Sequence, residues 1–296
     1  EGRFGKMPVE EMLRILGQTQ GGPEVQVLYQ TLALRKKEAL PFVLEKLRTG
    51  SMSEKRMLTK FLGLCAWPEA KGVLLEMASN ASEHWLPRQG ALYALGALGD
   101  AAAGPVALAV LKSDAAGINL QMAAISTISR TGYKEALPAL APFEASENIH
   151  LRLFASRARA DLGGAMDTPF LLKALQHPDY VARQEASEAL WRADGDEVTR
   201  ALQTVATGDQ NEAVRDSAMQ SLLRREIAGR TPAEKVEILN RSMEQAGRLT
   251  SLWILRTILE EAGASGRGFV EKMTTRNDFL GEHSRAYLVL AMARTE

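Results

Sequence analysis

The sequence has very few of the residues that build disulfide frameworks or metal sites. Its one cysteine, Cys65, excludes an intramolecular disulfide and any zinc site made of several thiolates. Cys65 lies in an apolar run, which favours a buried small hydrophobic residue over a reactive thiol. No histidine has a second His or Cys at metal-ligand spacing; the four are His84, His150, His177 and His283. We therefore expect no metal site.

Net charge is also absent, because 36 Lys and Arg residues balance 36 Asp and Glu residues. Duplex affinity comes mainly from neutralising phosphates, so this balance argues against a nucleic-acid partner unless the chain has a local basic patch. The chain has no Gly-x-Ser-x-Gly elbow, no phosphate-binding loop followed by Lys-Ser/Thr, and no His-Glu-x-x-His helix. The sequence thus predicts no catalytic residue and no cofactor, and it does not indicate a small-molecule ligand.

Aromatic residues are scarce, at 6% of the chain, and β-branched residues are thinly spread. Ala and Leu are abundant instead, which favours helices over sheets and predicts an all-α fold. A hydrophobic content of 46% is enough to build a substantial core. The chain begins at Glu1 rather than Met, so we expect a processed or truncated N-terminus. The compartment stays open between the cytoplasm and an exported or periplasmic location.

An internal repeat of 31 to 33 residues runs through most of the sequence. Segments such as RQGALYALGALGD and RQEASEALWRADG align on a leading arginine, with Gln121 replacing it in one unit. The leading arginines are Arg56, Arg88, Arg152, Arg183, Arg215 and Arg248. Three positions later every unit has a small residue: Thr59, Ala91, Ala124, Ala155, Ala186, Ala218 or Ser251. These positions share one face of a helix, so the pattern predicts a helix packed closely against its neighbours.

A second helix in each unit is predicted by prolines that precede aliphatic runs, at Pro41, Pro105, Pro138 and Pro169. Gly-containing pairs such as Gly99-Asp100 follow the arginine helices and predict their ends. This punctuation explains the run ALYALGALGDAAAGPVALAVL, residues 91–111, which is long and apolar enough to resemble a membrane span. We interpret it as two short helices joined at Gly99-Asp100.

The repeat resembles the HEAT repeat, and most of all the short units of bacterial and phycobilin-lyase-like chains, as in PDYVARQEASEALWRADGDEVTRALQTVATGD. The resemblance implies a right-handed α-solenoid of stacked antiparallel helix pairs, with the second helices on the concave side. It is strongest over residues 53–224. We expect residues 1–52 to form an N-terminal cap and a first divergent unit, and residues 225–296 to form divergent C-terminal units and a cap. Within the latter, Thr231-Pro232-Ala233-Glu234 has capping-box spacing and predicts a helix start.

The arginine series has two interpretations, a structural ladder and a stripe that binds phosphates or carboxylates. The ladder is favoured, because in HEAT-like stacks such arginines bond to turn carbonyls and acids of an adjacent unit. The turn acids Asp100, Asp161 and Asp194 are available for this role. Two tryptophans, Trp85 near a helix start and Trp191 late in its helix, are candidate exposed interface aromatics, although packing between units is also open to them. Trp253, among aliphatic residues, is expected in the core.

A complete repeat without catalytic motifs favours a non-enzymatic scaffold that holds a protein or peptide partner on a curved helical surface. The HEAT-like resemblance leaves two alternatives. One is an enzyme or accessory protein like the phycobilin lyases, which would require a tetrapyrrole pocket. The other is a DNA glycosylase built on HEAT-like helices, which would require a cationic concave face that the neutral charge balance does not support.

Overall fold

The described part of the chain forms α-helices and short 3-10 helices, with no strand within it. The computed structural model describes residues 4–19 and 21–295. The predicted all-α solenoid of helix pairs is confirmed. The chain divides into two compact units, unit 1 with residues 1–142 and 289–296, and unit 2 with residues 143–288.

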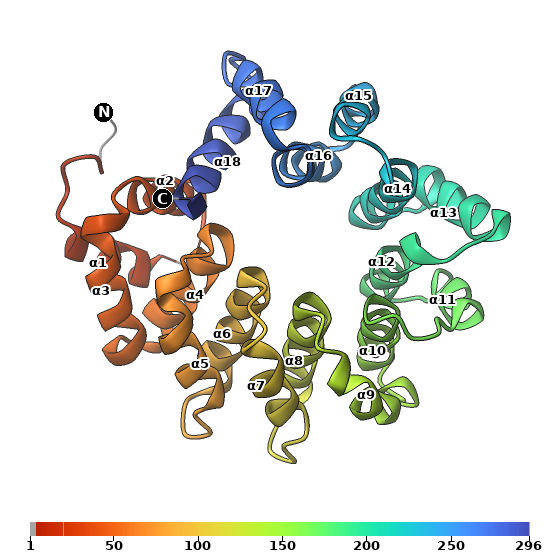
Figure 1. The fold of residues 1–296 in the computed structure, drawn as a ribbon, viewed down its shortest axis with the longest axis horizontal. Coiled ribbons are helices and arrows are strands. Elements are labelled where there is room, and N and C mark those ends of the chain that lie inside the picture. Colours follow the sequence, from red (N-terminus) through yellow and green to blue (C-terminus); the bar gives the residue numbers. More distant parts are fainter. Residues whose placement is uncertain (1–3, 20, 296) are drawn as a thin grey trace. The chain divides into compact units, whose positions relative to one another are not determined.

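Unit 1 contains the first eight helices and most of the ninth (Figure 1). They are α1 (Val9–Gln18), α2 (Pro23–Leu34), α3 (Lys36–Thr49), α4 (Met52–Cys65), α5 (Lys71–Ser79), α6 (Trp85–Leu98), α7 (Ala103–Leu111), α8 (Ile118–Thr131) and, in large part, α9 (Leu137–Glu144). Within this unit α4, α6 and α8 stack side by side in one row, and α3, α5 and α7 form a second row.

Unit 2 contains the remaining helices: α10 (Ile149–Asp161), α11 (Thr168–Ala174), α12 (Tyr180–Ala189), α13 (Asp196–Gly208), α14 (Glu212–Ile227), α15 (Pro232–Met243), α16 (Arg248–Glu261), α17 (Gly263–Met273) and most of α18 (Phe279–Thr295). Here α10, α12, α14 and α16 form one row, and the alternate helices pack behind it.

The arginine-led helices form the inner row of each unit taken by itself (Figure 1). We had expected the second, proline-led helices on the concave side, so this expectation is corrected. The inner helices approach closely because their small residues are buried: the exposed fraction of each side chain in the predicted column, from Thr59 to Ser251, is 6% or less.

The same hydrogen bond joins neighbouring inner helices in both units. The hydroxyl of Thr127 on α8 donates to the carbonyl of Leu92 on α6 over 2.8 Å, and the hydroxyl of Ser221 on α14 donates to Ser187 on α12 over 2.7 Å. In both cases the donor lies six positions after the leading residue of its repeat. The acceptor lies four positions after the leading residue of the preceding repeat. The repeat therefore fixes polar contacts as well as apolar ones.

The apolar run of residues 91–111 is two helices, as predicted. Helix α6 ends at Leu98, Gly99 takes a left-handed conformation with φ of 67°, and α7 begins at Ala103. No helix within the described ranges is both long enough and apolar enough to span a membrane. Cys65 is buried, as expected.

The two ends of the chain match the sequence predictions less uniformly. The capping box at Thr231 and Glu234 is present and starts α15, which confirms that prediction. Pro41 does not begin a helix, because α3 already starts at Lys36 and includes the proline. Pro41 is exposed, so the carbonyl that its missing N–H leaves unbonded can be solvated.

Candidate functional site

Three of the leading arginines bond to backbone carbonyls in or near the loop before their own helix. These are Arg88, Arg183 and Arg215, at donor–acceptor distances of 2.6–3.2 Å. The carbonyl acceptors are Ala78 for Arg88, His177 and Pro178 for Arg183, and Asp209 and Gln210 for Arg215. These arginines therefore link the end of a helix behind the inner row to the next helix of the inner row.

The acidic partners differ from the expected turn acids. Arg183 donates two hydrogen bonds to the carboxylate of Asp209, at 2.7 and 3.0 Å, and this contact lowers the pKa of Asp209. Asp100 accepts instead from Lys71, and Asp161 pairs with Arg192 and Arg157. Asp194 is exposed.

Arg56 and Arg152 depart from this pattern. Arg56 is exposed on α4, whereas its neighbour Lys55 is half-buried and bonds to Glu83 in the loop before the next inner helix. Lys55 thus makes the ion pair with the following loop that Arg183 makes in unit 2, although Thr59, three positions after Arg56, is buried as the repeat predicts. Arg152 lies 3.6 Å from Asp167 and stacks 3.8 Å from the centre of the Phe170 ring.

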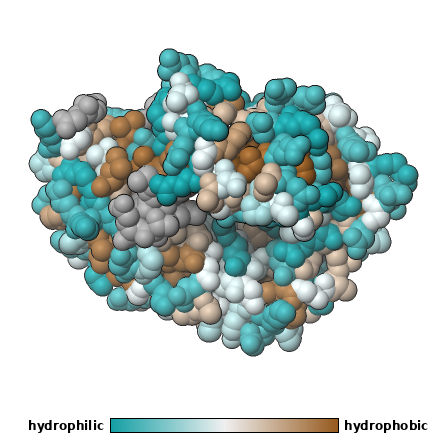
Figure 2. All heavy atoms as spheres, turned by 45° about the horizontal axis from the view of Figure 1, so that its top comes forward, coloured by the Kyte–Doolittle hydropathy of each residue, from teal (hydrophilic) through white to brown (hydrophobic). Residues whose placement is uncertain are grey.

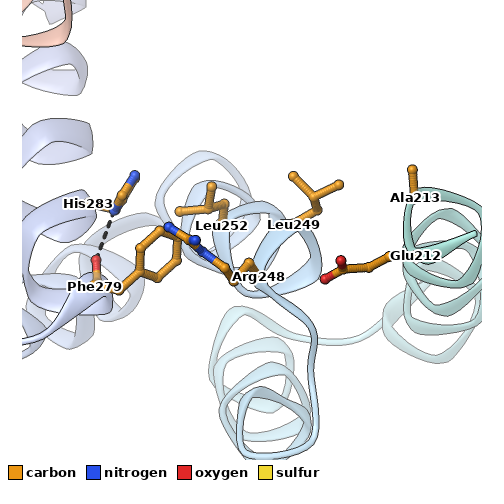
Figure 3. A pocket seen from close by; sticks show the side chains of 7 residues that line it. All are labelled: Glu212, Ala213, Arg248, Leu249, Leu252, Phe279 and His283. Carbon is orange, nitrogen blue, oxygen red and sulfur yellow. Dashed lines mark hydrogen bonds between the residues drawn. The ribbon is translucent and has the colours of Figure 1, made fainter. Parts of the chain in front are cut away.

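The sixth arginine, Arg248, lines a groove in unit 2 of about 440 Å³ (Figure 3). Its guanidinium group lies 4.2 Å from the centre of the Phe279 ring at one end of the groove. Leu249 and Leu252 project from α16 between this pair and Glu212, which comes from the first turn of α14. The remaining lining residues are Ala213 and His283. We call these seven residues the Arg248 groove.

The Arg248 groove has an apolar floor bounded by opposite charges. Leu249 is 48% exposed, although its neighbours Leu252 and Phe279 are half-buried. A ring nitrogen of His283 lies 2.8 Å from the carbonyl oxygen of Phe279, one turn earlier in α18, and the two rings are 4.1 Å apart. The groove can therefore hold an apolar side chain of a ligand on its floor, while a carboxylate of the same ligand pairs with Arg248.

The histidine of α10 lies between two carboxylates on the inner row of unit 2. The ring nitrogens of His150 lie 3.0 Å from Glu185 and 3.1 Å from Asp179. Burial works against the charged ring, but the hydrogen bond and the charge of Glu185, together with Asp179, outweigh it and raise the pKa of His150. Burial raises the pKa of Glu185 despite the contact with His150. Within the described ranges no group of His, Cys, Asp and Glu is suited to hold a metal.

Charges alternate along the rest of this inner row. Arg157 donates to Glu188 over 2.9 Å, and Arg192 pairs with Asp161 over 2.9 Å. Burial lowers the pKa of Arg224, whose guanidinium group lies against two tryptophan rings. Arg157 and Arg192 on this row are therefore each paired with a carboxylate of a neighbouring inner helix or its end.

The tryptophans occupy three kinds of environment. Trp85, the first residue of α6, is 42% exposed, whereas Trp191 is half-buried with Arg192 over its ring at 4.3 Å. Trp253 is partly buried and packs against the core of unit 2. Trp67 is fully buried.

Sequence reasoning missed most of the Arg248 groove, because the connection from α16 to α18 exceeds the repeat period. A usable signal was present: several inner helices begin with a large apolar residue, and Phe279 of α18 continues the series. The others are Met52, Trp85, Ile118, Ile149 and Tyr180.

No protein-family model matches this chain, and no curated protein matches its sequence. Among solved structures, it is similar to the complex of CpcE and CpcF of phycocyanin lyase from Nostoc sp. PCC7120, with a TM-score of 0.58 at 17% identity, covering 79% of this chain and 93% of that chain. Weaker similarities are to human deoxyhypusine hydroxylase in complex with glycerol, with a TM-score of 0.34 at 17% identity over 100% of both chains, and to an engineered protein, with a TM-score of 0.25 at 16% identity over 97% of both chains.

The first similarity shows a HEAT-like helical-repeat fold. It also corrects the expectation that the chain is not an enzyme, because that expectation took a helical repeat without catalytic motifs to exclude catalysis. Phycocyanin lyase is an enzyme whose chain has this fold. A solenoid fold is therefore no argument against catalysis, and the exclusion is withdrawn.

Proposed function

We propose that this chain is a subunit that binds another protein chain, and that the Arg248 groove receives an apolar side chain of that partner. The groove joins an exposed leucine, a half-buried aromatic ring and a cation in one concave place. On the side drawn in Figure 2, hydrophobic residues form separate patches among hydrophilic ones, so apolar binding positions on that side are local. The similarity to a chain solved in a two-chain complex is consistent with this role.

The exposed half of Leu249 is the observation that carries the proposal. Full burial of a leucine side chain contributes about 1.5–3 kcal/mol, and 48% of Leu249 is still exposed. A partner that covers it would gain roughly 1 kcal/mol at this residue alone, which corresponds to about a fivefold change in affinity. A carboxylate of the partner beside Arg248 would add a charge-assisted hydrogen bond.

Affinity purification from the source cells tests the proposal. The same substitution, leucine to aspartate, is made in the groove in one variant and outside it in another. Leu249→Asp puts a carboxylate into the groove and is expected to lose the bound protein. Leu34→Asp is the matched control, since Leu34 is 67% exposed in unit 1 and outside the groove. Both variants should retain the helical circular dichroism of the wild type. Equal recovery of the same protein by both variants would refute the groove as its binding site.

A second candidate is a role like that of phycocyanin lyase, either as an enzyme subunit or as an accessory protein of the phycobilin-lyase type. It is supported by the similarity over 79% of this chain, with a TM-score of 0.58. A bilin added to the purified chain should then change its absorbance spectrum, and Phe279→Ala should reduce the change if the groove holds the bilin. An unchanged spectrum would remove this candidate.

We also propose that Arg88, Arg183 and Arg215 are structural, since they bond to backbone carbonyls between helices. Arg248 is the member of the series assigned to the groove, because it is one of the residues that line it.

A further inference from the structure

The inner row of unit 1 carries cations but almost no carboxylates. Helices α6 and α8 of this row contain no Asp or Glu, and α4 contains only Glu54. Glu54 accepts from the backbone N–H of Ser51 over 2.7 Å and pairs with Lys46 at 3.1 Å, so its charge is already neutralised. Arg56 and Lys60 on α4 are both exposed. This row therefore differs from the inner row of unit 2, where charges of both signs alternate.

Large apolar side chains are exposed along one edge of the same row, where its three helices begin. Met52, Trp85 and Ile118 are the first residues of α4, α6 and α8, and they are 42–49% exposed. On α4, Met52, Arg56 and Lys60 follow at four-residue spacing and so share one helix face. Apolar anchors and cations thus occur together on a surface that three consecutive repeats build.

We infer that the inner row of unit 1 binds an acidic amphipathic segment of a partner protein, in which carboxylates alternate with apolar side chains. The carboxylates would pair with Arg56 and Lys60, and the apolar side chains would cover Met52, Trp85 and Ile118. This surface lies in unit 1 and is separate from the Arg248 groove, so the inference goes beyond the function proposed above.

The dimensions favour a polypeptide over a small molecule. Packed helices lie roughly 8–10 Å apart, so three helices in a row extend the apolar anchors over about 16–20 Å. That is the length of about six residues of extended chain or about twelve residues of helix. Small molecules bind instead where lining groups converge and cover most of the ligand.

The balance of contacts favours a polypeptide over nucleic acid as well. Nucleic-acid affinity depends on the neutralisation of many phosphates, and the chain as a whole has no net charge. The surface offers three large apolar anchors, Met52, Trp85 and Ile118, beside the exposed cations Arg56 and Lys60 of α4. An acidic peptide with apolar side chains uses both features, whereas a phosphate backbone uses only the cations.

Fluorescence anisotropy with the full chain tests the inference. The probe is a labelled synthetic 20-residue peptide that alternates Glu with Leu and Phe, and the expected result is saturable binding that weakens with salt. Arg56→Glu combined with Lys60→Glu should weaken binding about tenfold, because each removes an attraction and adds a repulsion. Trp85→Ala should weaken it several-fold by removing an apolar anchor.

Lys112→Glu combined with Lys134→Glu is the matched control, since both lysines are exposed in unit 1 but outside the inner row. It makes the same change in net charge and should alter affinity less than twofold. These substitutions all lie in unit 1, whereas Leu249→Asp tests the groove of unit 2, so the two proposals fail separately. The inference is overturned by no binding of the peptide, by equal losses in both double variants, or by tighter binding of a single-stranded oligonucleotide of equal charge.

Discussion

Replacing Gly90 by alanine should destabilise the chain, although alanine is the better helix former. Gly90 lies within α6, where alanine gains about 1 kcal/mol over glycine. The added Cβ, however, would lie 2.9 Å from the Cβ of Thr59 on α4 and closer still to its hydroxyl oxygen. Thr59 is 1% exposed, and its hydroxyl donates to the carbonyl of Arg56 over 3.0 Å, so it has little room to move. Overpacking of this kind costs about 1–3 kcal/mol.

The packing cost opposes the helix gain of about 1 kcal/mol, and a net loss of up to about 2 kcal/mol is expected, with a fall in Tm of up to roughly 8 °C. Differential scanning calorimetry is the measurement. Gly72→Ala is the control, because Gly72 lies exposed in α5 and an added Cβ would meet no atom within 4 Å. It should raise Tm. If Gly90→Ala also raised Tm, the close approach of α4 and α6 would be refuted.

Two further predictions concern single polar groups in unit 2. Helix α16 begins after Gly247, which has no capping side chain, and buried Asp216 of α14 accepts from the N–H of Thr250 over 3.2 Å and from its hydroxyl. Asp216→Ala should therefore cost about 0.5–2 kcal/mol in chemical denaturation and Asp216→Asn less; a wild-type midpoint for the alanine variant would contradict this. The pKa of His150 is raised above its unfolded value of about 6.5, so its contribution to stability is complete below that pH and is lost as the pH rises through the native pKa. Between pH 6 and 9 the wild type should lose more Tm than His150→Gln, and equal losses would refute the role of this pair.

The periodic part of the fold could be predicted from the sequence, because each unit repeats the same packing problem. The small column from Thr59 to Ser251 marks the faces where inner helices meet, and the turn at Gly99 divides an apolar run that length alone would assign to a membrane. The ion pairs between units are harder to predict. Lys55 and Arg56 are adjacent cations on α4, and only the structure shows that Lys55 makes the contact with Glu83.

The Arg248 groove could not be predicted, because it forms where the period breaks. The leading arginine was identified, but its role depends on Phe279, which α18 brings to it from 31 positions further along the chain. The choice of inner row also depends on packing, since both helices of each pair have an apolar face. The exclusion of enzymatic activity failed for a different reason, because a fold does not decide the chemistry of the sites it carries.

Photo-crosslinking at Leu249 tests the central claim, that the Arg248 groove is a site where another protein chain binds. A photoreactive amino acid would replace Leu249 in one variant and Leu34 in the other, and both variants would be irradiated in the source cells. The account predicts one discrete protein adduct from position 249 that is absent from position 34. No adduct at position 249, or the same adducts at both positions, would contradict it.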